Sequence, residues 1–106
     1  MENVQELTNG VFDEFIKKGV VLIDFSADWC MPCLMMAPIL EEVGEKLAGK
    51  IKIGKVDVGE NQDIASKFGV SSIPNFVLFK DGKMAEQFVG SMPAEVLEEK
   101  LNKFLK

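Results

Sequence analysis

Hydrophobic and polar positions change their spacing several times along the chain, and each change marks the boundary of an element. Short runs rich in β-branched and aromatic residues are typical of strands. Such runs occur at residues 4–7, 20–26, 51–58, 75–80 and 84–89. Between them apolar residues recur at helical intervals, which predicts helices after residue 8, after residue 30, at residues 63–68 and after residue 91.

Signals at the ends of these segments support the helices. Thr8 and Ser91 can each cap a helix, and Gly19 and Gly69 can each end one. Pro38 lies inside the second helix, where it removes an amide donor and should kink the helix. From the first, second and last helix we expect these side chains to face the core: Val11, Phe12, Phe15, Ile16, Met36, Leu40, Val43, Leu47, Leu97, Leu101, Phe104 and Leu105.

Strands that alternate with helices predict an α/β fold, in which helices cover a central sheet that is parallel at first. Asp81-Gly82 between the last two strands is a strong hairpin signal, so the sheet should end in an antiparallel pair. A chain of 106 residues is expected to form a single domain, residues 1–106.

Composition narrows the chemistry that this domain can carry out. The chain has no His, which excludes Ser-His and Cys-His catalysis and His-ligated metal sites. All 12 basic residues are Lys, and the net charge is −5. Since the Lys residues are scattered and no Arg is available to grip phosphate, we expect no nucleic-acid partner.

The N-terminal segment MENVQELTNG has neither a basic head nor an apolar stretch, so we expect no secretory signal. The longest apolar run, residues 20–25, is interrupted by Asp24 and is far too short to span a membrane. A cytoplasmic protein without membrane contact is therefore expected. In that compartment two Cys residues are not expected to form a permanent disulfide.

Both Cys residues belong to one motif, Cys30-Met31-Pro32-Cys33, at the junction of a predicted strand and a predicted helix. The free amides and positive dipole end of a helix N-terminus stabilise a thiolate, which is the nucleophilic form of Cys. A spacing of three places both sulfur atoms on one side of the first turn. Closing so short a loop stabilises a fold by only about 2 kcal/mol, so the motif favours redox chemistry over a structural role.

Metal binding is the alternative interpretation of the Cys pair. A zinc site usually has four ligands, and this chain offers two Cys and no His. Cu(I) prefers softer ligands, and Met31, Met35 and Met36 lie close by in the sequence. A protein that binds or carries Cu(I) is therefore the second hypothesis, although Met36 also fits the core stripe of its helix.

Residues 25–33 (FSADWCMPC), followed by Ala37-Pro38, closely resemble the active-site segment of the thioredoxin family. Residues 72–75 (SIPN) resemble the second signature of that family, and residues 80–82 (KDG) its hairpin turn. The similarity extends over nearly the whole chain. It implies the thioredoxin fold, a mixed five-stranded sheet flanked by about four helices, and a thiol-disulfide oxidoreductase that reduces protein disulfides.

The resemblance also assigns roles to residues. Cys30 would be the exposed attacking thiolate, and Cys33 would resolve the mixed disulfide. Pro74 matches the cis-proline of the family, and Ile73 would offer backbone hydrogen bonds to an extended substrate. For Trp29 the alternative is plain core packing. The resemblance implies that the apolar surface for partner proteins consists of Trp29, Met31, Pro32, Ile73, Pro74 and Gly90.

Asp24 lies on the strand face that it shares with Val20 and Leu22. A carboxylate in such a run is costly to bury unless it is paired or neutral. The resemblance implies that Asp24 is a buried acid that moves a proton to and from Cys33, with Lys55 as its partner. The alternative is an exposed Asp on an edge strand.

The chain departs from the family pattern at Ser26, Met31, Leu34 and Asn75, where an aromatic residue, Gly, Lys and Thr are more common. The pair between the two Cys residues tunes thiolate stability and therefore the reduction potential. The resemblance further implies client proteins with disulfides, a thioredoxin reductase of unspecified type, and a monomer. We expect no bound cofactor and no metal, because the dithiol itself carries two electrons.

Overall fold

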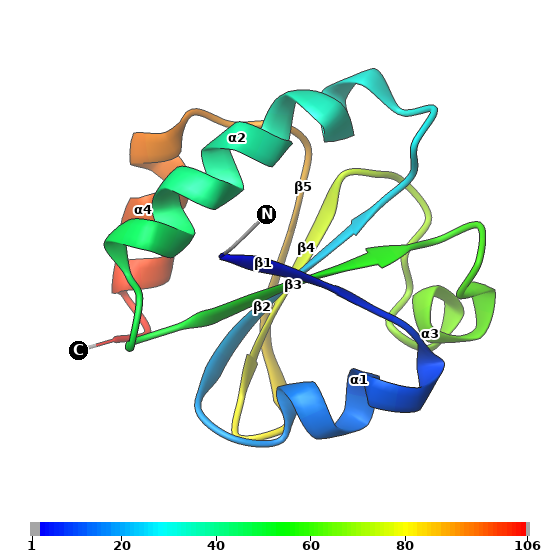
Figure 1. The fold of residues 1–106 in the computed structure, drawn as a ribbon, viewed down its shortest axis with the longest axis horizontal. Helices are drawn as coiled ribbons and strands as arrows, with labels where there is room; N and C mark the ends of the chain where they lie inside the picture. Colours follow the sequence, from blue (N-terminus) through cyan, green and yellow to red (C-terminus); the bar gives the residue numbers. More distant parts are fainter. Residues whose placement is uncertain (1–2, 106) are drawn as a thin grey trace.

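The computed structural model describes residues 3–105. The expected domain limits, residues 1 and 106, and the first two residues of the N-terminal segment lie outside this range. The described strands are β1 (Val4–Leu7), β2 (Val20–Ser26), β3 (Lys52–Asp57), β4 (Asn75–Lys80) and β5 (Lys83–Val89). The described helices are α1 (Asn9–Ile16), α2 (Met31–Lys46), α3 (Gln62–Lys67) and α4 (Ala94–Asn102), in the predicted order (Figure 1).

The strands form one mixed sheet in the order β1-β3-β2-β4-β5. β1, β3 and β2 are parallel, β4 is antiparallel to β2, and β5 is antiparallel to β4. Because β2 is the central strand, six of its seven residues are buried. Burial on both faces explains why β2 lacks the polar alternation of a half-exposed strand.

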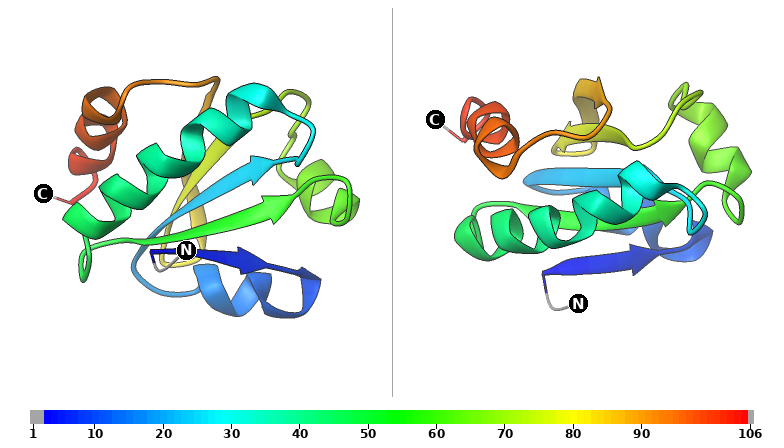
Figure 2. Two further views of the ribbon diagram at one scale, coloured as in Figure 1. Left: turned by 45° about the horizontal axis from the view of Figure 1, so that its top comes forward. Right: turned by 90° about the horizontal axis from the view of Figure 1, so that it is seen from above.

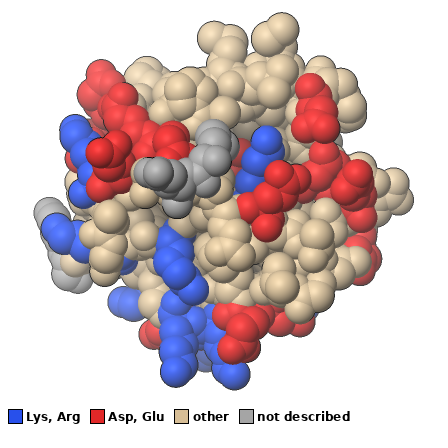
Figure 3. Space-filling model, viewed as in Figure 1, with Lys and Arg blue, Asp and Glu red and all other residues tan. Residues whose placement is uncertain are grey.

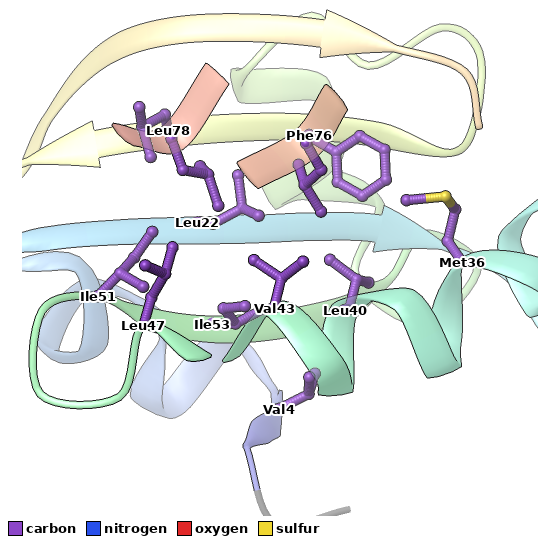
Figure 4. Packing of buried hydrophobic residues seen from close by; sticks show 12 residues of the cluster. Val4, Leu22, Met36, Leu40, Val43, Leu47, Ile51, Ile53, Phe76 and Leu78 are labelled. Carbon is purple, nitrogen blue, oxygen red and sulfur yellow. The ribbon is translucent and has the colours of Figure 1, made fainter. Parts of the chain in front are cut away.

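Helices cover both faces of the sheet, α2 and α4 on one side and α1 and α3 on the other (Figures 1 and 2). The core on the first side consists of Val4, Leu22, Met36, Leu40, Val43, Leu47, Ile51, Ile53, Phe76, Leu78, Leu97 and Leu101 (Figure 4). The core on the second side consists of Leu7, Phe12, Ile16, Val21, Ile23, Phe25, Val56, Ile64, Ala65, Val77 and Phe79. The four core positions predicted for α2 are all buried.

The first helix differs from the prediction in two respects. Val11 is exposed, because Phe12 and Ile16 occupy the face of α1 that packs on the sheet. The helix also ends at Ile16, before Gly19. Thr8 is the N-cap as predicted, although its side chain makes no capping hydrogen bond.

The last helix begins later than predicted. Its N-cap is Pro93 rather than Ser91, and its first residue is Ala94. The ring of Pro93 holds φ at −65°, a value suited to entering a helix without a side-chain cap. Phe104 and Leu105 lie beyond the end of α4 and are half-buried against the first core.

The hairpin turn between β4 and β5 lies where Asp81-Gly82 predicted it. Asp81 has a φ of 51° and Gly82 a φ of 86°, the left-handed conformation that a two-residue hairpin turn requires. The turn is tied to the start of β2 by two hydrogen bonds, from Gly19 N to Asp81 Oδ1 (2.8 Å) and from Asp81 N to Gly19 O (2.9 Å). The opposite end of β2 leads into the Cys motif.

Candidate active site

Cys30 is the N-cap of α2, four residues after the end of the central strand. Its amide donates to Ala27 O at 3.2 Å, and its carbonyl accepts from Leu34 N at 3.0 Å. Pro32 lies in the first turn, where its missing amide costs little. The strand-to-helix junction predicted from the sequence is therefore confirmed, and it places Cys30 at the positive end of a 16-residue helix.

Cys30 and Cys33 form a disulfide, with their Cα atoms 5.2 Å apart. Cys33 N donates a hydrogen bond to Cys30 Sγ at 3.2 Å. After reduction a thiolate on Cys30 could accept this same hydrogen bond, and a donor aimed at a sulfur favours its charged form. The local geometry is therefore suited to a reversible dithiol with a nucleophilic first Cys.

The Cys pair is less accessible than the resemblance implied. Cys30 is 6% exposed and Cys33 4%, so the expectation of an exposed Cys30 is wrong for this oxidised state. The two residues form a small apolar cluster with Ala27, against which Val58 and Ile73 pack. Access to the disulfide is therefore restricted to a partner that fits closely around Cys30.

The loop before β4 meets the Cys cluster through Ile73. The Ile73–Pro74 peptide bond is cis, as the resemblance implied, and Pro74 is buried. Gly90 N, at the end of β5, donates to Pro74 O at 2.9 Å. The fold therefore brings Ile73 against the Cys cluster, although Ile73 lies 40 residues after Cys33, and Pro74 and Gly90 are linked to Ile73 through the peptide bond and this hydrogen bond.

Trp29 is 79% exposed, so the alternative of plain core packing is wrong for this residue. Met31 and Pro32 are also exposed, next to Cys30. Large exposed apolar side chains gathered at one place mark a surface for another macromolecule. A groove of about 600 Å³ lies beside α1 and is lined by neither Cys.

Asp24 is 2% exposed, and the alternative of an exposed edge residue is wrong because β2 lies between β3 and β4. Burial raises the pKa of its carboxyl from the ordinary 3.8 to about 7, and the charge of Lys55 lowers it in part. Asp24 and Lys55 are register partners on parallel strands. Asp24 Oδ1 has no hydrogen-bond partner among residues 3–105.

The sequence identified Asn75 as a departure from the family pattern but missed what it does. Asn75 Nδ2 donates to Ser72 O at 3.3 Å, and Asn75 Oδ1 accepts from Gln87 Nε2 at 2.9 Å. Gln87 also donates to Phe68 O at 3.2 Å. These bonds fasten the loop that carries Pro74. The available signal was a buried-strand position that holds an amide instead of an apolar side chain.

The described part of the chain contains no group of three or more His, Cys, Asp and Glu residues that could hold a metal ion. Met36 is fully buried in the core, whereas Met31 and Met35 are exposed. Within residues 3–105, a Cu(I) site beside the Cys pair would therefore draw its thioethers from Met31 or Met35. No helix in that same range is long and apolar enough to cross a membrane.

Comparison with known proteins agrees with this geometry. A family model described as Thioredoxin matches residues 3–103. Thioredoxins of Bacillus subtilis (strain 168) and Staphylococcus haemolyticus (strain JCSC1435) are 47% and 48% identical over 102 residues, which cover 96% of this chain and 98% of each relative. The structure of a mutant thioredoxin from Halobacterium salinarum NRC-1 is similar with a TM-score of 0.89, at 34% identity over 98% of this chain and 92% of that one.

The chain belongs to the thioredoxin family. It has the thioredoxin fold, and it is a thiol-disulfide oxidoreductase that reduces protein disulfides through its Cys pair. The family implies client proteins with disulfides and a thioredoxin reductase.

Proposed function

We propose that Cys30 is the nucleophile and Cys33 the resolving residue. The Cys30 thiolate attacks one sulfur of a client disulfide, so that a mixed disulfide forms and the first client thiolate leaves. The Cys33 thiolate then attacks Cys30 Sγ and releases the second client thiolate. The dithiol is oxidised and the client disulfide is reduced, and two electrons are transferred. The hydrogen bond from Cys33 N to Cys30 Sγ supports this order, because it stabilises the first attacking thiolate.

Asp24 is the proposed proton acceptor and donor for Cys33, with Lys55 as its charged partner. A buried carboxyl with a pKa of about 7 changes protonation state near neutral pH, where a general base is most effective. Asp24 lies on the same sheet face as Leu22, and Leu22 packs against α2 in the first core. The carboxyl therefore lies on the side of the sheet that α2 covers, the helix that carries Cys33.

Trp29, Met31, Pro32, Ile73, Pro74 and Gly90 are the proposed docking surface for clients. The exposure of Trp29 and Met31 and the closeness of Ile73 to the Cys cluster support this surface. In the same proposal an extended client segment forms hydrogen bonds with the backbone of Ile73.

The proposal also includes the state in which the domain acts and its partners. The protein acts as a single domain, residues 1–106, and as a cytoplasmic monomer. A thioredoxin reductase returns the disulfide to the dithiol. The domain requires no bound cofactor, and its partners do not include nucleic acid or a membrane.

Reduction of insulin disulfides in the presence of dithiothreitol tests the residue assignment. The wild type should accelerate the reaction, and Cys30→Ser should abolish the acceleration. Wild-type protein that is inactive in this assay, yet binds Cu(I) tightly and in a 1:1 ratio, would support the soft-metal hypothesis instead.

A further inference from the structure

The outer face of α2 carries an apolar stripe next to the disulfide. Met31, Leu34, Met35 and Pro38 are spaced three and four residues apart and are all exposed. Residues at this spacing lie on one side of a helix. The inner side of the same helix is occupied by Cys33, Met36 and Leu40, which are buried, so this outer stripe takes no part in the core.

The stripe continues as an acidic segment. Glu42 and Glu45 follow at the same helical spacing, and both are exposed. Neither forms an ion pair with any residue in 3–105, whereas Lys46 is paired with Glu98. By the rise of a helix, the two carboxylates lie about 18 to 22 Å along α2 from Cys30.

Acidic residues dominate the charge around this face, and the basic residue that follows Glu42 and Glu45 on α2, Lys46, is paired with Glu98. The sequence contains no basic residue between Lys18 and Lys46, a stretch that includes the Cys motif and nearly all of α2. In Figure 3 uncharged atoms cover the end of α2 that carries the Cys motif, and acidic side chains gather over its far half. A partner that docks along α2 therefore meets an apolar surface first and a negative one farther out.

We propose that the outer face of α2, formed by Met31, Leu34, Met35, Pro38, Glu42 and Glu45, docks a segment of a redox partner protein. That segment carries apolar side chains next to its reactive Cys, and Lys or Arg residues about 20 Å away. This inference rests on the proposed function and specifies which partners the disulfide accepts. The surface is continuous with the docking surface described above and extends away from it along α2.

The chemistry of the stripe agrees with such a partner. Met side chains are flexible and polarizable, so they adapt to apolar surfaces of different shape. Leu34 stands where a cation is more common in the family, so the end of the stripe next to the Cys pair carries no positive charge that would repel a basic partner segment. Opposite charges across an interface mainly accelerate association and exclude wrong partners.

Peptides with a chromogenic mixed disulfide test the proposal. Each peptide contains one Cys, three apolar residues, a spacer and a terminal cluster of three Lys, three Glu or three Ser. Every peptide is also made with its sequence reversed. A spacer of about one residue centres the cluster about 20 Å from the Cys in an extended peptide. The rate of reduction by the full reduced protein is measured at low and high salt, in wild type and in Glu42→Gln/Glu45→Gln. The control is Asp13→Asn/Asp63→Asn, which makes the same charge change on exposed residues of α1 and α3.

The wild type should reduce the Lys peptide about fivefold faster than the Glu peptide at low salt. This preference should be lost at high salt and in Glu42→Gln/Glu45→Gln, but kept in the control. Leu34→Ser should slow all three peptides, whereas Met84→Ser, an exposed position on β5, should not. An equal preference in both double variants, or equal rates for all three peptides, would overturn the inference while leaving the disulfide reductase intact. Failure to reduce any peptide would overturn the proposed function as well.

Discussion

Asp24 and Lys55 are register partners on the adjacent parallel strands β2 and β3, and the charge of Lys55 opposes the effect of burial on the pKa of the Asp24 carboxyl. Burial raises the pKa of the Asp24 carboxyl to about 7, and the Lys55 charge lowers it. Lys55 is half-buried, so its charge is partly screened and burial has the larger effect. The balance places the carboxyl where it can both take up and release a proton near neutral pH.

Asp24→Asn should stabilise the fold at pH 8. The carboxyl of the folded protein binds its proton more tightly than the carboxyl of the unfolded chain. Its favourable contribution to the free energy of unfolding is therefore full below pH 3.8 and is lost as the pH rises to about 7. The variant removes this loss and should gain roughly 2–4 kcal/mol at pH 8, and much less at pH 4. Denaturant unfolding at both pH values measures the difference.

The same Asp24→Asn variant should exchange disulfides more slowly, because Cys33 loses its proton acceptor. Stopped-flow disulfide exchange between pH 5 and pH 9 follows this step. A variant with a wild-type rate and unchanged stability at pH 8 would mean that the carboxyl is neither buried nor involved.

Lys55→Gln should move the Asp24 carboxyl further from its ordinary pKa, because it removes the charge that opposes burial. As for the wild type, the free energy of unfolding falls as the pH rises, and a higher pKa in the folded state extends this fall to higher pH. The variant should match the wild type near pH 5 and be roughly 1 kcal/mol less stable near pH 9. Its pH–rate profile should shift toward alkaline pH, and a profile that stays in place would contradict the pairing.

Cys33→Ser should accumulate mixed disulfides with client proteins, because attack by Cys30 remains possible and resolution does not. Cys30→Ser should accumulate few. Brief alkylation of the reduced wild type, followed by peptide mass analysis, should label Cys30 before Cys33. Preferential labelling of Cys33 would reverse the assignment.

Trp29→Ala should lower the rate of insulin reduction with little effect on folding. Since Trp29 is 79% exposed, the free energy of unfolding should change by less than about 0.5 kcal/mol. Loss of a large aromatic anchor from a docking surface should slow the reaction about tenfold. Met84→Ala, an exposed position on β5, is the matched control and should be unaffected in both measurements.

Gly82→Ala should destabilise the fold by about 1 kcal/mol, because Gly82 has a φ of 86°, which a side chain disfavours. The turn is tied to the start of β2, at the end remote from the Cys motif. Thermal unfolding should show the loss, while insulin reduction at 25 °C stays at the wild-type level. A lowered rate would show that the turn is coupled to the site.

Most of the fold could be predicted because its signals are local. The strand at residues 20–26 and the hairpin at Asp81-Gly82 appear where the sequence placed them. The predictions that failed concern helix ends and faces: Val11 satisfied the helical spacing but lies outside, and Ser91 had the chemistry of a cap but Pro93 takes that position. Spacing alone cannot decide which of two neighbouring apolar residues faces the sheet.

In the candidate site, too, the features with local signals could be predicted, and the features that depend on distant contacts could not. The sequence by itself determined the redox pair, because Cys30 and Cys33 lie within one helical turn and their chemistry depends on that turn. It also indicated that the Asp24 carboxyl, if buried, would have to be paired or neutral. Only the tertiary structure decided that Trp29 faces outward, that Gly90 bonds to Pro74, and that Asn75 and Gln87 hold the loop between them. These contacts join segments far apart in the chain, and their register is set by the packing of every element on the sheet at once.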